Sequence, residues 1–452
     1  MLALQPLIDA LRDGRVRARE LIEQCLQRIA DPSGEGSAAF LHVFAAEARA
    51  HADSIDRLRA ARASVPPFAG IPVSVKDLFD VAGLTTGAGS KALYTLPPAP
   101  RDAEVVERLR AAGMIVLGRT NMTEFAYSGL GVNPHFGTPR NPFDRATGRI
   151  PGGSSSGAAV SVTDEMAAAA LGTDTGGSAR IPAAMTGIVG FKPTAARVSR
   201  RGVLPLSTTL DSVGWLAPTV ACCALLDAVL AGGPKSGELE LPAPFPARGL
   251  RLLVPESYVL DDLDDHVAAT FERSLAALSR AGAVLLPAPL PELERLPEIH
   301  AKGGFSAAES YTEYHDLIAA QGDLIDPRVA VRILKGREQT AADYVRLISA
   351  RADLIEKVSR RSAAVDALVM PTVPIVAPAL RELESDAAYF RANALALRNT
   401  MIANFLDRCA ISIPAHRGGD APVGLMLMGE HGLDRKLLAI ARSVESLLSP
   451  AR

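Results

Sequence analysis

The chain of 452 residues is nearly neutral, with a formal charge of −2, and 48% of its residues are apolar. This composition provides apolar side chains for a large core but no basic field that would attract nucleic acid, so no DNA or RNA partner is expected. No run of about 18 uncharged apolar residues occurs, and charges interrupt the N-terminal segment, so neither a membrane span nor a signal peptide is expected. Four cysteines without metal-binding spacing predict no metal site, and reduced thiols favour a cytoplasmic location.

Helix and strand patterns alternate along the chain. Apolar residues at helical spacing predict N-terminal helices over about 1–62, and a short β-branched run ending at Lys76 predicts a strand. Further helices are predicted at 103–112 and 266–281, and further strands at 114–117, 250–254 and 283–286. The alternation predicts an α/β fold in which helices cover both faces of a sheet. The proline-containing stretch 232–249 is the best candidate for a surface loop, and no break in composition divides residues 1–452 into separate domains.

The stretch 150–194 contains two serines in glycine-dense turns, Ser154 in Gly-Gly-Ser-Ser-Ser-Gly and Ser178 in Gly-Thr-Asp-Thr-Gly-Gly-Ser. Glycine at this density lets a backbone approach a ligand closely. Converging amide groups there would stabilise a developing oxyanion, and we expect this hole at Thr175, Gly176, Gly177 and Ser178. A flexible surface turn is the alternative reading of any one such loop. A phosphate-binding loop is excluded because no lysine follows either glycine cluster in the required register.

A reactive serine needs a base, and histidine is absent from the surrounding sequence. No histidine lies between His135 and His266, and Ser178 has no Gly-x-Ser-x-Gly elbow, which argues against an α/β-hydrolase. Lys76 is the lysine best placed to serve as a base, since burial at a strand end would lower its pKa from about 10.4. Taken alone, Lys76 would fit a solvated strand-end charge better.

These motifs, together with Gly-Ile-Val-Gly-Phe-Lys-Pro-Thr at 187–194, resemble the amidase signature family. The similarity continues through segments 70–80, 118–125, 211–214, 369–372 and 422–425, and so spans nearly the whole chain. The resemblance implies an α/β amidase-signature fold with a large mixed, mainly parallel β-sheet core covered by helices on both faces. It also implies a signature core at about 68–220 and a variable region at about 290–400 that caps the pocket.

The resemblance further implies a Ser–cis-Ser–Lys triad. Ser178 would be the nucleophile, Ser154 the bridging serine after a cis peptide bond, and Lys76 the base, with an acyl-enzyme on Ser178 as intermediate. Asp174 and Arg180 would support the nucleophile loop. Phe125, Ala126, Tyr127 and Ser155 would contact the substrate, and one of the cap residues Phe305, Tyr311, Tyr314 and His315 is a further candidate.

The expected activity is hydrolysis of a small carboxamide to a carboxylic acid and ammonia or an amine, without cofactor or metal. The identity of the acyl group stays open, and a homodimer is compatible with the family. One alternative is an amidotransferase A-type subunit that hydrolyses glutamine with partner chains. Another is a non-catalytic relative, which the intact Lys76, Ser154 and Ser178 argue against.

Overall fold

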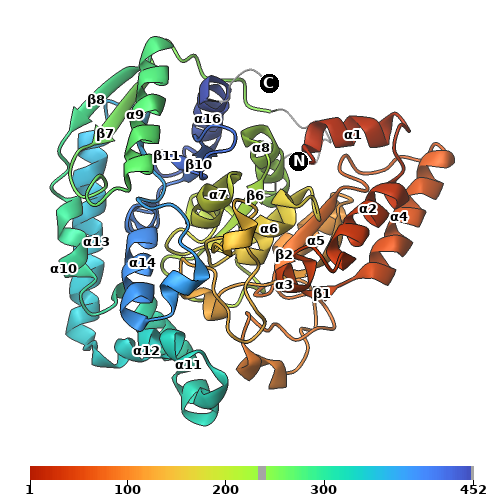
Figure 1. Ribbon diagram of the computed structural model, residues 1–452, viewed down its shortest axis with the longest axis horizontal. Helices are drawn as coiled ribbons and strands as arrows, with labels where there is room; N and C mark the ends of the chain where they lie inside the picture. The colour runs from red at the N-terminus through yellow and green to blue at the C-terminus, as the bar shows by residue number, and fades with distance from the viewer. Residues whose placement is uncertain (233–240, 449–452) are drawn as a thin grey trace.

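The computed structural model describes residues 1–232 and 241–448, and a single mixed sheet runs through the whole of it (Figure 1). The sheet has 11 strands in the order β1-β3-β2-β4-β6-β5-β10-β11-β9-β7-β8. The strands are β1 (Phe40–Val43), β2 (Pro72–Lys76), β3 (Ile115–Thr120), β4 (Ala169–Asp174), β5 (Val189–Lys192), β6 (Ser212–Ala217), β7 (Arg251–Pro255), β8 (Val284–Ala288), β9 (Ala367–Pro371), β10 (Ala410–Pro414) and β11 (Gly424–Met428).

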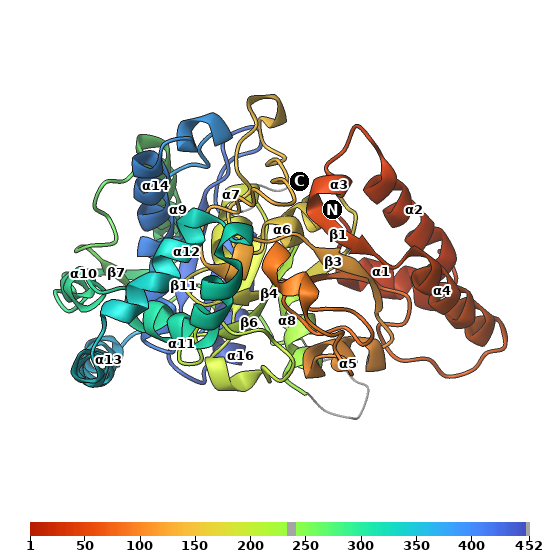
Figure 2. The same ribbon diagram turned by 90° about the horizontal axis from the view of Figure 1, so that it is seen from below.

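Helices cover both faces of the sheet, as expected. They are α1 (Leu4–Arg12), α2 (Ala18–Ala30), α3 (Gly36–Ala39), α4 (Ala45–Ala60), α5 (Glu104–Ala111), α6 (Ser156–Thr163), α7 (Arg180–Thr186), α8 (Val220–Leu230), α9 (Asp265–Arg280), α10 (Leu296–Ile299), α11 (Gly304–Gln321), α12 (Pro327–Leu334), α13 (Ala341–Ser362), α14 (Asp386–Arg398), α15 (Met401–Phe405) and α16 (Asp434–Leu448). Helices α6 and α7 pack together on one face, and α5, α8 and α16 lie on the other (Figure 2). Strands β2 and β4 are buried along their whole length between these layers.

The sheet is mixed, but the expectation that parallel pairs would dominate is wrong. In the described residues four strand pairings are parallel, all made by β2 and β7, and six are antiparallel. Parallel neighbours need a crossover connection, and the sequence pattern revealed those crossovers. The antiparallel centre, β4-β6-β5-β10-β11-β9, brings together strands from distant parts of the chain, and local periodicity does not reveal such pairings.

Several local predictions are confirmed within one to three residues, although the N-terminal segment predicted as helices also contains strand β1. The unit β7–α9–β8 is a parallel crossover, and α5 and β3 follow each other as expected. Cys222 and Cys223 are buried core residues of α8, and all four cysteines are unpaired. The predicted surface loop at 232–249 falls partly on 233–240, which lie outside the described residues.

The region 290–400 contributes strand β9 to the sheet and helices α10 to α14, which gather on one side of the molecule (Figure 1). Helix α12 begins where the side chain of Asp326 accepts a hydrogen bond from the Arg328 amide, with Pro327 at the first helical position. Glu124 Oε2 accepts a hydrogen bond of 2.6 Å from the Asp326 amide, which ties the start of α12 to the segment after β3.

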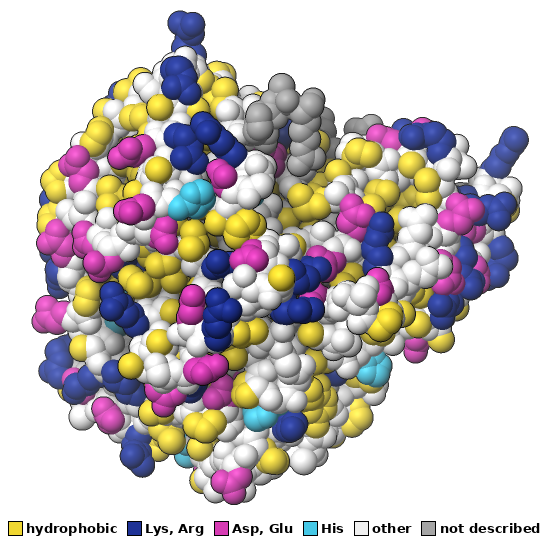
Figure 3. Space-filling model, viewed as in Figure 1, with side chains coloured by type: hydrophobic (Ala, Val, Ile, Leu, Met, Phe, Trp, Pro, Cys, Tyr) yellow, Lys and Arg dark blue, Asp and Glu magenta, His cyan; other side chains and the backbone are white. Residues whose placement is uncertain are grey.

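The molecular surface carries acidic and basic side chains interspersed with apolar ones on the face seen in Figure 3. None of the helices in the described ranges has the length and hydrophobicity needed to cross a membrane.

Candidate active site

Lys76 is the last residue of β2, a strand held between β3 and β4, and its amine is completely buried. Nζ donates hydrogen bonds to Ser154 Oγ at 2.7 Å and to Thr173 Oγ1 at 2.9 Å. Burial lowers the pKa of Lys76 to about 7, although the negative charges of Asp174 and Asp211 favour the protonated form. The amine is therefore partly neutral in neutral solution and can accept a proton.

Ser154 lies in the turn before α6, and the peptide bond between Gly153 and Ser154 is cis, the geometry that the family resemblance implies. Its carbonyl oxygen accepts a hydrogen bond of 3.1 Å from the Thr123 amide. The next residue, Ser155, donates its amide hydrogen to the carbonyl oxygen of Ser178 at 3.2 Å. The two serine turns, distant from Lys76 in sequence, thus meet at the end of β2.

Ser178 lies in the turn between β4 and α7 and lines a cavity of about 750 Å³. Among the residues that the structure describes, no group makes a hydrogen bond to its hydroxyl, Ser154 included. The structure thus brings Lys76 into contact with Ser154 and joins the turns of the two serines, and Ser178 lines the cavity.

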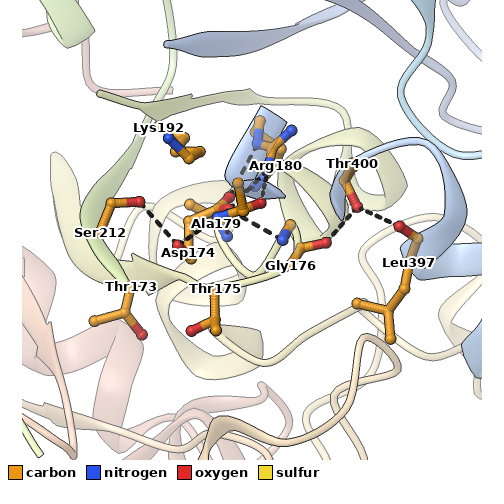
Figure 4. A network of polar contacts seen from close by, with 12 residues as sticks. Thr173, Asp174, Thr175, Gly176, Ala179, Arg180, Lys192, Ser212, Leu397 and Thr400 are labelled. Atoms are coloured by element: carbon orange, nitrogen blue, oxygen red, sulfur yellow. Dashed lines mark hydrogen bonds and ion pairs between the residues drawn. The ribbon is translucent and has the colours of Figure 1, made fainter. Parts of the chain in front are cut away.

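Asp174 and Arg180 form a buried ion pair with 2.8 Å between Nη2 and Oδ1 (Figure 4). The carboxylate also accepts hydrogen bonds from the amides of Gly177 at 3.0 Å and Ala179 at 3.1 Å, and from Asn404 Nδ2 at 2.9 Å. Burial would raise the pKa of Asp174, but the charge and hydrogen bonds of Arg180 outweigh it and hold that pKa at about 2. This fixed charge holds both ends of the Ser178 turn.

The expected set of four oxyanion-hole amides is reduced to three by this network. The Gly177 amide already donates to Asp174, so it is not a free donor. In the described part of the chain the amides of Thr175, Gly176 and Ser178 donate to no other group. Thr400 Oγ1 donates to the Gly176 carbonyl oxygen at 2.6 Å and so fixes the orientation of this peptide (Figure 4).

Two of the four predicted substrate contacts lie at the cavity and two do not. Ala126 and Tyr127 line the cavity. Phe125 lies behind them, with its ring centroid 4.6 Å from that of Tyr314, and the Ser155 hydroxyl donates to the Thr173 carbonyl oxygen at 3.4 Å instead. Phe125 and Ser155 are buried and do not line the cavity, because their side chains pack into the core.

Residues of the cap complete the cavity, and sequence reasoning missed most of them. Of the cap residues that were suggested, only Phe305 lines it. The polar lining residues not predicted are Ser128, Asp262, His300, Ser306, Arg332, Lys335, Asn393 and Arg398. Nothing in the spacing of the basic residues in this region distinguishes those that line the cavity from those that face solvent.

Arg332 of α12 is held rigidly at the cavity wall. Its guanidinium carbon lies 4.1 Å from the centroid of the Tyr127 ring, and Nη1 donates to the Tyr127 carbonyl oxygen. In the described residues no carboxylate forms an ion pair with Arg332 or Lys335. Asn393 accepts hydrogen bonds on Oδ1 from Ser128 Oγ and the Gly129 amide, which directs its Nδ2 group away from these partners. The cavity wall formed by these residues therefore carries two cationic side chains, Arg332 and Lys335, and the amide donor of Asn393.

Within residues 1–232 and 241–448, no cluster of three or more His, Cys, Asp or Glu side chains is arranged to bind a metal ion.

Comparisons with known proteins agree with this geometry. The family model described as Amidase matches residues 20–438. The chain is 39% identical to 2-amino-5-chloromuconic acid deaminase of Comamonas testosteroni over 97% of this chain and 94% of that protein. It is 34% identical to the A-type subunit of the glutamyl-tRNA(Gln) amidotransferase of Cupriavidus taiwanensis over 98% of this chain and 96% of the relative. A crystal structure of an amidase superposes with a TM-score of 0.88 at 32% identity, covering 99% and 100% of the two chains. The chain therefore belongs to the amidase family.

Proposed function

We propose that this chain hydrolyses a small linear carboxamide through an acyl-enzyme on Ser178. The observation that carries the proposal is the buried Lys76 amine, 2.7 Å from Ser154 Oγ, in a turn joined to that of Ser178, which lines a cavity. Ser178 Oγ attacks the amide carbonyl carbon while its proton passes by way of Ser154 to neutral Lys76. The proton then returns to the departing nitrogen, the C–N bond breaks, and water hydrolyses the ester to release the acid and regenerate Ser178.

The tetrahedral intermediate requires donors for its oxyanion. The free amides of Thr175, Gly176 and Ser178 are the proposed hole, and Asp174, Arg180 and Thr400 hold its shape. In a known case the loss of one such donor costs about 2.7–4 kcal/mol in the barrier.

The substrate class is proposed to be amides that also carry a carboxylate. Arg332 and Lys335 lie at the cavity without a carboxylate partner in the described residues, and Asn393 adds an amide donor. A guanidinium fixed against an aromatic ring is suited to bind a carboxylate. The name of the deaminase relative also denotes an acid. Apolar lining residues such as Phe305, Met401 and Phe405 would contact the rest of the acyl chain.

The second candidate is an amidotransferase A-type subunit, which the 34% identity to that protein supports. Glutamine also carries a carboxylate, so the cavity alone does not separate the two functions. An isolated chain that hydrolyses non-glutamine amides favours the amidase, while dependence on a co-purified partner chain favours the amidotransferase.

Release of ammonia by the purified chain from matched pairs of amides tests the proposal. The two amides of a pair differ in one end group: succinamate, for example, carries a carboxylate where butyramide carries a methyl group. Glutamine and ureido compounds are tested alongside the pairs. Activity is expected with the carboxylate member of a pair and is expected to vanish in Ser178→Ala. Ser161→Ala is the matched control, because Ser161 is equally buried in α6 but bonds Ser74 at 2.8 Å and does not line the cavity. If no amide releases ammonia and a fluorophosphonate does not label Ser178, the proposal that the chain is catalytic is refuted.

The broader proposals are a single functional unit over residues 1–452, a cytoplasmic location and a homodimer. The continuous sheet supports a single functional unit, and the four unpaired buried cysteines support a cytoplasmic location. The homodimer follows from the family resemblance, and sedimentation analysis tests it.

A further inference from the structure

Asp211 lies immediately before β6 and is bound through both carboxylate oxygens. Oδ1 accepts a hydrogen bond of 2.6 Å from Thr175 Oγ1, while Oδ2 accepts from the amides of Leu206 at 2.9 Å and Ser207 at 3.1 Å. The residue is 6% exposed. Thr175 lines the cavity next to Gly176, so Asp211 joins the turn that carries Ser178 to the segment 206–211.

The segment 206–211 is in turn fixed by the cap. Glu309 of α11 accepts hydrogen bonds from the Thr209 amide at 3.1 Å and from the hydroxyls of Ser207 and Thr209. Leu206 and Leu210 line the cavity. A continuous set of hydrogen bonds therefore runs from the cap helix through Asp211 to Thr175.

Asp211 is also one of the two carboxylates whose charge acts on Lys76. The other, Asp174, is neutralised by Arg180 at 2.8 Å. In the described residues no lysine or arginine forms an ion pair with Asp211. The charged and titratable groups that act on it are Lys76, Arg200 and Tyr314, and burial raises its pKa to about 6. At neutral pH, Asp211 is thus the less compensated negative charge near the lysine.

We propose that Asp211 is a positioning residue for the reaction: it fixes Thr175 in the oxyanion-hole turn, and its charge stabilises the protonated Lys76 that forms when Ser178 attacks. This inference rests on the proposed function. It assigns one carboxylate to both halves of the site, the oxyanion donors and the base.

The test uses a fluorophosphonate probe, so no substrate need be known. Ser178 Oγ attacks phosphorus, fluoride leaves, and the serine proton passes to Lys76. The labelling rate is measured from pH 5 to 9 in wild type, Asp211→Asn, Thr175→Val and Thr175→Ser. Asp434→Asn is the matched control, because Asp434 is also buried and binds a threonine in the same way, Thr194 at 2.8 Å, but Thr194, unlike Thr175, does not line the cavity.

Each variant has a distinct expected result. Asp211→Asn labels at least about tenfold more slowly at pH 8, since a displaced oxyanion donor costs part of its roughly 10²–10³-fold effect. In Asp211→Asn, the rise of the labelling rate with pH, which reports deprotonation of Lys76, moves to lower pH by about one unit. The reason is that loss of a nearby negative charge disfavours protonated lysine. Thr175→Val slows labelling without moving this rise, Thr175→Ser restores the rate, and Asp434→Asn changes neither.

Several outcomes overturn the inference. A rise of the labelling rate that stays at the same pH in a folded Asp211→Asn shows that the charge does not act on Lys76. If Asp211→Asn does not fold, the two Thr175 variants test the positioning role instead. Equal labelling rates in Thr175→Val and Thr175→Ser refute it. Wild type that is not labelled at Ser178 refutes the proposed function itself, and the inference with it, which distinguishes this failure from the others.

Discussion

Replacement of Lys76 by methionine is expected to abolish activity and, at neutral pH, to stabilise the fold. The folded-state pKa of Lys76 is about 7, below the ordinary value of 10.5. The unfolded chain therefore binds more protons between these two values, and wild-type stability rises with pH across the window. The destabilisation caused by Lys76 is fully present below about pH 7 and disappears as pH approaches 10.5.

The size of the effect follows from the two pKa values. Each unit corresponds to about 1.4 kcal/mol, so the lowered pKa corresponds to roughly 4–5 kcal/mol of destabilisation. Methionine has a similar length, but it forfeits the hydrogen bonds to Ser154 and Thr173, each worth about 1 kcal/mol. The net expectation is a variant more stable by about 2 kcal/mol at pH 7, with an advantage that shrinks at higher pH.

Urea denaturation of both proteins from pH 6 to 10, with fluorophosphonate labelling alongside, measures the two effects. Lys192→Met is the matched control: Lys192 is equally buried, burial lowers its pKa to about 8, and it bonds backbone carbonyls away from the cavity. It is expected to keep Ser178 labelling. A Lys76→Met variant that is less stable than wild type at pH 7, with a difference independent of pH, would refute the claim that the lysine is held neutral.

Three further changes address the turn and the cavity wall. Gly177→Ala is expected to unfold or inactivate the protein, because Gly177 has φ +130° and a Cβ there would lie 2.1 Å from Thr400 Oγ1; thermal melting and labelling report the two losses. Asp174→Asn leaves Arg180 buried without its charge partner and is expected to cost about 3–5 kcal/mol by urea denaturation. Because the pKa of Asp174 is lowered from 3.8 to about 2, wild type has this stabilisation in full above pH 3.8, so the titration of Asp174 itself adds no pH dependence to the loss from pH 5 to 9. Arg332→Gln is expected to raise KM about 10–100-fold for succinamate but not for butyramide, as loss of a charged hydrogen bond implies; an equal change for both amides contradicts a carboxylate site.

The sequence predicted the parts of the site that depend on local chain geometry. Lys76 ends a buried strand and Ser178 follows another, and both features are visible as short apolar runs next to glycine-rich turns. Apolar residues at helical spacing around Val329 and Leu347 mark the buried faces of α12 and α13. Recognition of the family supplied the pairing of Lys76 with Ser154, which spacing alone left open.

The remaining parts depend on contacts between distant segments. Arg332 was indistinguishable from a solvated arginine until the fold placed it over Tyr127. Ser155 was expected at the substrate, but the register of its turn directs the hydroxyl to Thr173. Asn404 and Thr400 gave no signal at all, because their roles exist only through contacts with the Ser178 turn. Local patterns do not encode such tertiary partners.

The contacts that complete the nucleophile turn have a consequence for how the protein matures during synthesis. Asn404 is 230 positions beyond Asp174, and Thr400 is 224 beyond Gly176. Strands β10 and β11, which lie beside β5 in the middle of the sheet, come later still. A nascent chain that has emerged only to residue 399 therefore contains Lys76, Ser154 and Ser178 but lacks two of the side chains that hold the Ser178 turn. Such long-range closure slows folding. It also means that a growing polypeptide cannot complete the contacts around the Ser178 turn until the ribosome has delivered Thr400 and Asn404.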